Sequence, residues 1–407
     1  MLRTEAPKKW SDIYPQLATS QISSEECTSE ALYNDEIKYV FKKAWLFAAH
    51  RLDLAKPGDY IVKEFPATKS SILLCHQKDG TIQGFHNVCR HRLAKLLPSD
   101  GRGCLNRFTC EFHGWTYNTS GDLIGMPDPD GILVKESLGL IKVPTAVWNG
   151  FVFICLDPNP QQSFKDYLGG IGSHPVNQFP FGNEWDSWGW RIEVKANWKI
   201  VKDLFSETYH VAFVHKNSVH KMYSAPSNPF LHLPVVDFFG PHYKFTGPAS
   251  EEPADAAGPI GALSVKYGGS KSSRYGKARD ALPGVNPEGL SNWALDSYGI
   301  FPNFNVNIFG SLWHYHLFEP LGVDRCAWEN RIFFPKAQNA GERFAHEYAQ
   351  SLQLALGSED MSAAERNQSG METGGVPEYA LHDQEIALRF IHKGVIDYVA
   401  QNKGREA

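Results

Sequence analysis

Two short segments in the first third of the chain carry residues that can hold a metal. Residues 89–91 read Cys-Arg-His, and residues 110–113 read Cys-Glu-Phe-His. Each segment offers one thiolate and one imidazole, which suits zinc or an iron–sulfur cluster. A Cys2His2 zinc finger groups its cysteines and its histidines separately, whereas the two types alternate here. The order favours a cluster with two unlike irons, although a structural zinc site stays an alternative.

The residues around these four side chains resemble the signature of a Rieske [2Fe–2S] centre. The similarity covers Cys-Arg-His-Arg at 89–92, Asp-Gly-Arg-Gly at 100–103, and Cys-x-x-His-Gly-Trp-x-Tyr at 110–117. It implies that one iron is held by Cys89 and Cys110 and the other by His91 and His113. Two features depart from the pattern, because the spacer is about one residue longer than usual and Leu93 replaces a frequent glycine. The loops lack the extra cysteines of respiratory Rieske proteins, so the resemblance is to oxygenase-type domains.

A second cluster of polar residues lies at 203–215, which reads Asp-Leu-Phe-Ser-Glu-Thr-Tyr-His-Val-Ala-Phe-Val-His. On an ideal helix His210 and His215 would point about 140° apart, so they converge only if the helix distorts or ends between them. Taken alone, two histidines at this spacing are more often separate packing or surface residues than metal ligands.

Together with Asn-Trp-Lys at 197–199 and the Rieske signature, this stretch resembles the mononuclear-iron motif of Rieske non-haem iron ring-hydroxylating oxygenases, large (alpha) subunit. The resemblance implies an iron held by His210, His215 and one carboxylate from a later helix. Residues 358–370 resemble that helix, with Asp360 as the expected ligand and Glu359 as the alternative. A solvated acidic helix end would also explain these two carboxylates.

The resemblance also assigns roles to two further acidic residues. Glu207 occupies the place of an aspartate that links the two metal centres across neighbouring subunits, where it would accept hydrogen bonds from His210 and from His113 of the adjacent chain. A glutamate also occurs there in a branch that acts on quaternary amines. Asp203 stands where an acid or amide often borders the iron, although it could equally be helix surface.

The expected function is that of a terminal oxygenase component. Electrons from NAD(P)H would arrive through a separate reductase, with or without a ferredoxin, because the chain has no GxGxxG fingerprint of its own. Mononuclear Fe(II) and O2 would then hydroxylate or oxidatively dealkylate a small, aromatic substrate, in a homotrimer with or without a small beta subunit. The alternatives are a monooxygenase of quaternary or methylated amines and a Rieske electron carrier that lacks the catalytic iron.

The elements that must position these residues form an α+β protein. We expect an N-terminal arm and helix at 1–46, an antiparallel-β Rieske domain at 47–160, and a catalytic domain at 161–407 with a central antiparallel sheet flanked by helices. A helix is predicted for residues 29–50, and further helices for 341–357 and 381–401. The Gly- and Pro-containing stretch 247–293 is either a lid or an insertion. Aromatic residues at 300–305 and 311–316 line a pocket or fill strand core.

Composition narrows the class of protein. The 407 residues carry a formal charge of −5, which offers no basic surface for nucleic acid or anionic lipid. The seven cysteines are an odd number, which fits a reducing compartment. No apolar run approaches the length of a membrane span, and residues 1–30 are too acidic for a transit peptide. We therefore expect a cytoplasmic protein without a membrane or nucleic-acid partner.

Overall fold

The computed structural model describes residues 9–132, 138–183, 185–250, 258–272, 282–309 and 312–406. The chain divides into two compact units. The smaller unit consists of Phe41–Tyr167 and Phe181–Asn183. The larger unit consists of Met1–Val40, Leu168–Pro180 and Glu184–Ala407. Each is described by itself.

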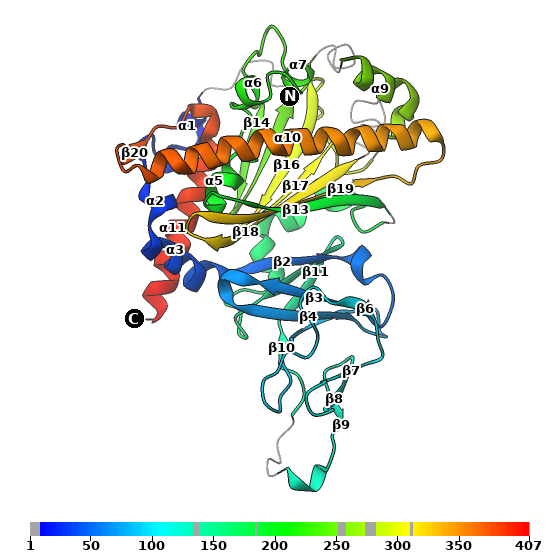
Figure 1. Ribbon diagram of the computed structural model, residues 1–407. Coiled ribbons are helices and arrows are strands. Elements are labelled where there is room, and N and C mark those ends of the chain that lie inside the picture. The colour runs from blue at the N-terminus through cyan, green and yellow to red at the C-terminus, as the bar shows by residue number, and fades with distance from the viewer. Residues whose placement is uncertain are drawn as a thin grey trace. The chain divides into compact units, whose positions relative to one another are not determined.

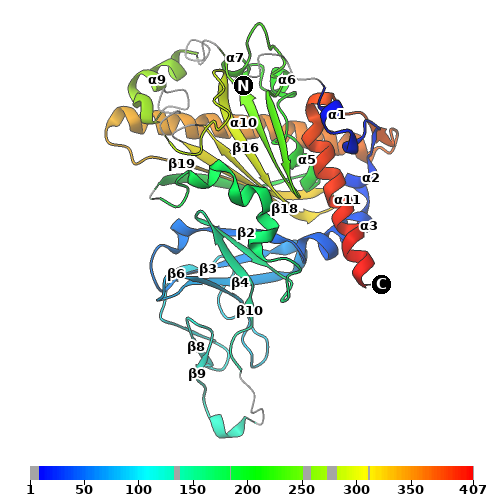
Figure 2. The ribbon, with the colours of Figure 1, turned by 180° about the vertical axis from the view of Figure 1, so that it is seen from behind.

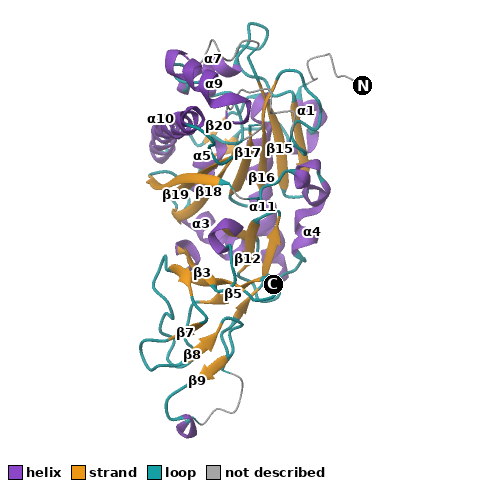
Figure 3. Ribbon diagram, turned by 90° about the vertical axis from the view of Figure 1, so that its right-hand side faces the viewer, coloured by secondary structure: helices purple, strands orange, loops and turns teal. Residues whose placement is uncertain are grey.

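The smaller unit is built of three antiparallel sheets (Figure 3). Their orders are β10-β5-β4-β3-β6, β11-β12-β2 and β7-β8-β9. The strands are β2 (Trp45–His50), β3 (Asp59–Phe65), β4 (Ser70–His76), β5 (Ile82–His86), β6 (Arg102–Cys104), β7 (Arg107–Thr109), β8 (Thr116–Asn118), β9 (Leu123–Gly125), β10 (Lys142–Val143), β11 (Thr145–Trp148) and β12 (Phe151–Cys155).

A shared core holds the segments that carry the Rieske motif. Phe85 of β5, Phe108 of β7 and Tyr117 of β8 are fully buried in one cluster together with both cysteines of the motif. Phe108 and Tyr117 are also paired across the β7–β8 ladder, so the loop between these strands begins and ends on buried aromatic side chains.

The predicted helix over residues 29–50 is wrong in its second half. Helix α3 spans Glu30–Glu36 and continues as one π-helical turn over Ile37–Phe41, after which the chain enters strand β2. Every residue of β2 is buried. An apolar run buried on both faces has no alternation, and periodicity alone cannot distinguish it from a buried helix.

The larger unit has one antiparallel sheet of seven strands in the order β13-β19-β18-β17-β16-β15-β14 (Figures 1 and 2). These strands are β13 (Asp186–Val194), β14 (Val235–Phe239), β15 (His242–Pro248), β16 (Trp293–Ile300), β17 (Phe304–Ile308), β18 (Trp313–Gly322) and β19 (Arg325–Phe334). Two short strands, β1 (Ile22–Ser23) and β20 (Glu378–Tyr379), pair separately. The structure confirms the predicted α+β class.

Helices flank this sheet, and the longest, α10 (Ala340–Glu372), crosses it in Figure 1. Helix α11 (Ile386–Glu406) packs on β14, where Phe390 stacks on Phe238 with ring centroids 4.1 Å apart. The other α-helices that the structure describes are α1 (Trp10–Ile13), α2 (Glu25–Thr28), α4 (Phe164–Leu168), α5 (Trp198–Asp203), α6 (Val211–Val214), α7 (His220–Tyr223) and α9 (Gly258–Ser272).

Two predictions bear on these helices. Stretch 247–293 contains helix α9, and residues 251–257 and 273–281 of the stretch lie outside the described residues. Among the helices that the structure describes, none combines the length and low polarity needed to cross a bilayer.

Candidate metal centres and active-site pocket

The two loops of the Rieske motif have the same backbone construction. In the first, the Cys89 carbonyl accepts a hydrogen bond from Leu93 N, and in the second the Cys110 carbonyl accepts one from Gly114 N. The fourth residue after each cysteine has a positive φ, +60° at Leu93 and +71° at Gly114. Leu93 therefore stands at a position where glycine would relieve strain, which explains why the family pattern often has glycine there.

The side chains of the motif suit the cluster that its pattern predicts. Cys89 and Cys110 are buried, whereas His91 and His113 lie side by side with ring centroids 4.5 Å apart. His91 stacks on Trp115, and its buried Nδ1 has no hydrogen-bond partner among the described residues. Burial raises the pKa of the Cys89 thiol, while the Tyr117 hydroxyl, 3.3 Å from the sulfur, favours the thiolate. An imidazole nitrogen without a partner is available to bind a metal.

The helix interruption that the second cluster requires is present. Helix α5 ends at Asp203, and α6 is a separate turn of four residues, Val211–Val214. His210 is the residue before α6 and His215 the residue after it, and the two rings lie 5.1 Å apart between centroids. The break brings together two histidines that a continuous helix would direct apart.

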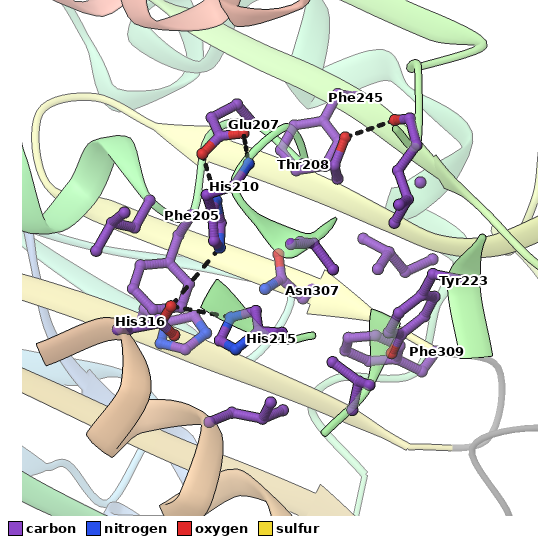
Figure 4. Close-up of a pocket in the computed structure, with 18 of the residues that line it drawn as sticks. Phe205, Glu207, Thr208, His210, His215, Tyr223, Phe245, Asn307, Phe309 and His316 are labelled. Carbon is purple, nitrogen blue, oxygen red and sulfur yellow. Dashed lines mark hydrogen bonds and ion pairs between the residues drawn. The ribbon is translucent and has the colours of Figure 1, made fainter. Parts of the chain in front are cut away.

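Asp360 of α10 completes a group of three converging side chains. Figure 4 labels the other two, His210 and His215. Its Oδ1 lies 3.0 Å from Nε2 of His215 and 3.6 Å from Nε2 of His210. This carboxylate is 3% exposed, and Oδ1 receives no hydrogen bond from the described residues. One ligand atom from each of the three residues lies within 4.8 Å of the others. Two nitrogens and one oxygen in this arrangement match the 2-His-1-carboxylate set of non-haem iron.

The other ring nitrogen of each histidine is occupied by a carboxylate. Nδ1 of His210 donates to Glu207, and Nδ1 of His215 donates to Oε2 of Glu359 at 2.6 Å. Each imidazole consequently directs the lone pair of its Nε2 towards Asp360, and three electron pairs that face one another call for a cation between them. Burial opposes protonation of His210, but the Glu207 charge and hydrogen bond outweigh it and raise its pKa to about 9. A metal ion would compete with that proton.

Glu359 and Asp360 therefore have different surroundings although they are neighbours in sequence. Glu359 also accepts a hydrogen bond from the Ser218 hydroxyl at 2.7 Å, so its carboxylate is engaged outside the group of three. Only Asp360 faces both Nε2 atoms. This geometry favours Asp360 over Glu359 as the carboxylate ligand.

Two residues near the end of α10 fix the helix against the start of α5. Glu365 accepts a hydrogen bond from Lys195 N at 3.1 Å, and buried Gln368 accepts one from Asn197 N at 2.9 Å. Asn197 caps α5 by accepting from Lys199 N. These bonds set the rotation of α10 that directs Asp360 inwards.

Asp203 does not reach this group. Its Oδ2 lies 3.0 Å from Nε2 of His392 on α11, and Nδ1 of the same ring lies 2.7 Å from Glu26. Asp203 is not among the residues that line the pocket beside the histidines. It is part of a buried carboxylate–imidazole–carboxylate chain that joins α5, α11 and α2.

A pocket opens beside the three converging residues (Figure 4). Its lining is largely apolar and includes Phe205, Val219, Tyr223, Leu231, Phe245, Leu295, Phe309 and Leu356. Its other polar residues, besides Glu207, are Thr208, Asn307, His314, His316 and Gln353. Of the predicted aromatic stretches, only positions 314 and 316 reach the pocket, and Ser311 lies outside the described residues. Strand alternation could have indicated this, because His314 and His316 share one face of β18.

Comparison with known proteins supplies the family. Residues 183–401, more than half of the chain, match the family "Ring hydroxylating alpha subunit (catalytic domain)", and residues 44–144 match the "Rieske [2Fe-2S] domain". The chain belongs to the ring-hydroxylating alpha subunits. As in that family, a Rieske [2Fe–2S] domain precedes a catalytic domain, and the two together imply a [2Fe–2S] cluster and a non-haem iron.

The relatives of this alpha subunit are oxygenase components. It is 31% identical over 198 residues to the large oxygenase component of the naphthalene 1,2-dioxygenase system of Pseudomonas aeruginosa, which covers 47% of this chain and 43% of the relative. It is 30% identical over 269 residues to the chlorobenzene dioxygenase subunit alpha of Cupriavidus sp. (strain PS12), covering 57% and 59%. The matched stretches thus span about half the length of these relatives.

Solved structures share the fold at lower identity. A quaternary ammonium Rieske monooxygenase in complex with an inhibitor superposes with a TM-score of 0.75 at 18% identity, covering 97% of this chain and 99% of that one. A naphthalene 1,2-dioxygenase from Rhodococcus sp. bound to indole gives a TM-score of 0.71 at 20% identity, covering 96% of both. At such identity the likeness concerns the fold of the alpha subunit alone.

Proposed function

We propose that the chain is the terminal oxygenase of a multicomponent system that hydroxylates or oxidatively dealkylates a small, apolar organic substrate. The observation that carries this proposal is the convergence of His210, His215 and Asp360 on one point beside a largely apolar pocket. Bound there, Fe(II) would supply activation of dioxygen, while a [2Fe–2S] cluster on Cys89, His91, Cys110 and His113 would supply single electrons.

The protein's own residues hold and orient the reacting partners. Glu207 and Glu359 keep both imidazoles in the tautomer that leaves Nε2 free for a metal. Three protein ligands would leave an iron with coordination positions for dioxygen, and the apolar lining of the adjacent pocket would exclude water from the reaction.

The partners belong to the same proposal. Electrons come from NAD(P)H through a separate reductase, with or without a ferredoxin, and the chains assemble as a homotrimer, with or without a beta subunit. Glu207 would accept a hydrogen bond from His113 of the adjacent chain. Its position on Nδ1 of His210 supports that role. A carboxylate offers about four lone-pair sites, and the described donors, which are Nδ1 of His210 and the backbone N–H groups of Tyr209 and His210, use three of them.

Metal analysis tests the proposal directly. On anaerobically purified protein we expect about three irons and two acid-labile sulfides per chain, falling to about two irons and two sulfides in His210→Ala. His220→Ala is the matched control, because His220 lies on α7 outside the pocket lining. If wild-type protein holds only two irons per chain, the result would support the alternative of a Rieske electron carrier that lacks the catalytic iron. Zinc without sulfide would indicate a structural zinc protein.

Turnover is the second test. Reductase-driven oxygen uptake should be stimulated by an aromatic substrate in wild type and lost in His210→Ala, with the Rieske absorption spectrum unchanged. Because two solved structures with the same fold are described as a quaternary ammonium monooxygenase and a naphthalene dioxygenase, aromatic compounds and methylated amines should be screened side by side. Oxygen uptake that is stimulated only by methylated amines would instead support a monooxygenase of methylated amines.

A further inference from the structure

A cross-strand pair of polar residues stands in the otherwise apolar wall of the pocket. Asn307 of β17 lies opposite His314 of β18 in the ladder, and both line the pocket. Asn307 is 7% exposed, its Nδ2 lies 3.0 Å from Nε2 of His314, and the other end of its amide has no hydrogen-bond partner among the described residues. A buried amide with one end unsatisfied is costly unless a ligand completes it.

The chemical identity of that end follows from the neighbouring hydrogen bonds. The Nδ2 amide group of Asn330 donates to the carbonyl of Tyr315 at 3.1 Å, which fixes its orientation because a carbonyl only accepts. The same Nδ2 lies 3.2 Å from Nδ1 of His314 and 3.2 Å from Nδ1 of His316. Because Nδ1 of His316 already accepts from the indole N–H of Trp328, the second amide hydrogen is available to His314. Nδ1 of His314 therefore accepts, and the neutral ring carries its proton on Nε2.

An Nε2–H on His314 must face an acceptor, and Asn307 can provide one only through its amide oxygen. Rotation of the Asn307 amide by 180° about Cβ–Cγ places that oxygen on His314 and directs the NH2 group into the pocket. His316 follows the same logic, since the indole N–H of Trp328 donates to its Nδ1 at 3.0 Å and leaves the proton on Nε2. The lining therefore presents N–H donors to a ligand.

The charges of the lining agree with this polarity. Among the described lining residues the only carboxylates are Glu207 and Asp360, and both already face histidine nitrogens. The described residues of the lining include neither lysine nor arginine. A quaternary ammonium group would find no uncommitted carboxylate there, and a substrate carboxylate would find no cationic side chain.

We propose that the Asn307–His314 pair determines specificity by binding a neutral substrate that offers a hydrogen-bond acceptor, such as a carbonyl, ether or phenolic oxygen on an apolar ring. The acceptor binds the Asn307 NH2 group, while Phe309, Tyr223 and their apolar neighbours enclose the ring. This inference rests on the proposed function, since it assigns a substrate class to that pocket.

Two isosteric probes separate the hydrogen bond from simple burial. Acetophenone carries a carbonyl where α-methylstyrene carries a C=CH2 group, and equilibrium dialysis gives the Kd of each for anaerobic, iron-replete protein. We compare the ratio Kd(α-methylstyrene)/Kd(acetophenone) between variants, because the hydration of the probes then cancels. In Asn307→Leu the ratio should fall about fivefold, the typical value of one neutral hydrogen bond. Asn307→Asp should lower it at least as much, since a carboxylate cannot donate.

A control and a cationic probe complete the experiment. Thr208→Val alters another polar residue of the same lining, but that hydroxyl already donates to the Leu231 carbonyl at 2.7 Å, so the ratio should stay within twofold of wild type. Benzyltrimethylammonium should bind wild type more weakly than acetophenone and gain affinity in Asn307→Asp.

Three results would overturn the proposal: a ratio unchanged within twofold in both Asn307 variants, tighter binding of the ammonium probe in wild type, or no binding of acetophenone. Iron content and the cluster spectrum verify that each variant is folded. Dialysis requires no turnover, so failure of the proposed function appears in the iron and oxygen-uptake measurements, and failure of this inference appears in the Kd ratio.

Discussion

Replacement of Glu359 by alanine should weaken iron binding without abolishing it, because this carboxylate contacts a histidine and not the group of three ligand atoms. The substitution removes the acceptor of the His215 Nδ1–H bond at 2.6 Å and of the Ser218 hydroxyl bond at 2.7 Å. Loss of such a carboxylate partner typically lowers metal affinity 10- to 100-fold, about 1.4–2.7 kcal/mol. The Glu359 side chain is 31% exposed, so water replaces part of the bond and we expect about tenfold.

Asp360→Ala provides the contrast, because it removes one of three metal ligands and should reduce mononuclear iron to background. Anaerobic titration with Fe(II), followed by removal of unbound metal and iron analysis, gives the affinity of each variant. The visible absorption of the Rieske cluster verifies that the rest of the chain is intact.

Glu359→Gln tests the mechanism more finely. An amide oxygen can still accept from Nδ1 of His215, so this variant should bind iron more tightly than Glu359→Ala. The reasoning is refuted if Glu359→Ala loses its iron completely while Asp360→Ala retains it, since the ligand would then be Glu359. Equal affinities in wild type and Glu359→Ala would show that the hydrogen bond to His215 is dispensable.

Two further predictions concern backbone strain and pH. Leu93→Gly should stabilise the smaller unit by about 0.5–1 kcal/mol, because φ at this position is +60°. The absorbance of the cluster, followed during heating, gives the midpoint temperature of unfolding. Leu105→Gly is the control and should lower this midpoint, because Leu105 is not among the residues with positive φ. Burial opposes the charged form of His392, yet Asp203 and Glu26 outweigh it and raise its pKa to about 9. The resulting stability, up to about 3 kcal/mol for a shift from about 6.5, is fully present below pH 6.5 and is lost as pH rises through 9. Urea unfolding at pH 6.5 and 10 should show this loss in wild type, relative to His392→Gln, and a constant difference would contradict it.

Candidate ligands that lie close together in the sequence can be proposed from it, because their spacing constrains which metal they suit. The Cys-x-His and Cys-x-x-His loops need only a tight turn each, and the structure forms both turns with the same pair of backbone bonds. His210 and His215 can converge only if the helix breaks between them, and their spacing alone does not show that it does. The sequence could not decide between Glu359 and Asp360, since that choice depends on the rotation of α10. Bonds from Glu365 and Gln368 to the backbone at Lys195 and Asn197, about 170 residues earlier in the chain, set this rotation.

Other features depended on tertiary context. The helix predicted through residue 50 failed because β2 is buried on both faces and therefore shows no period. Asp203 was placed beside the iron by resemblance, but its partner His392 lies 189 residues away and no local pattern indicates it. Asn307 was not predicted as a site residue, because an isolated asparagine in a strand resembles any buried amide until its cross-strand neighbour is known.

Hydrogen bonds to Nδ1 determine whether Nε2 carries a proton in two pairs of histidines that line the pocket, and the outcome is opposite in the two pairs. Around the iron ligands, carboxylates accept from Nδ1 of His210 and His215, so Nε2 of each ring offers a lone pair to a metal. On β18, N–H donors occupy Nδ1 of His314 and His316, so Nε2 of each ring carries a proton instead. The same side chain is thus prepared as a metal ligand on one wall and as a hydrogen-bond donor on the other. The group bonded to Nδ1 decides which, so the proposed function expects a cation at one wall and an acceptor-bearing substrate at the other.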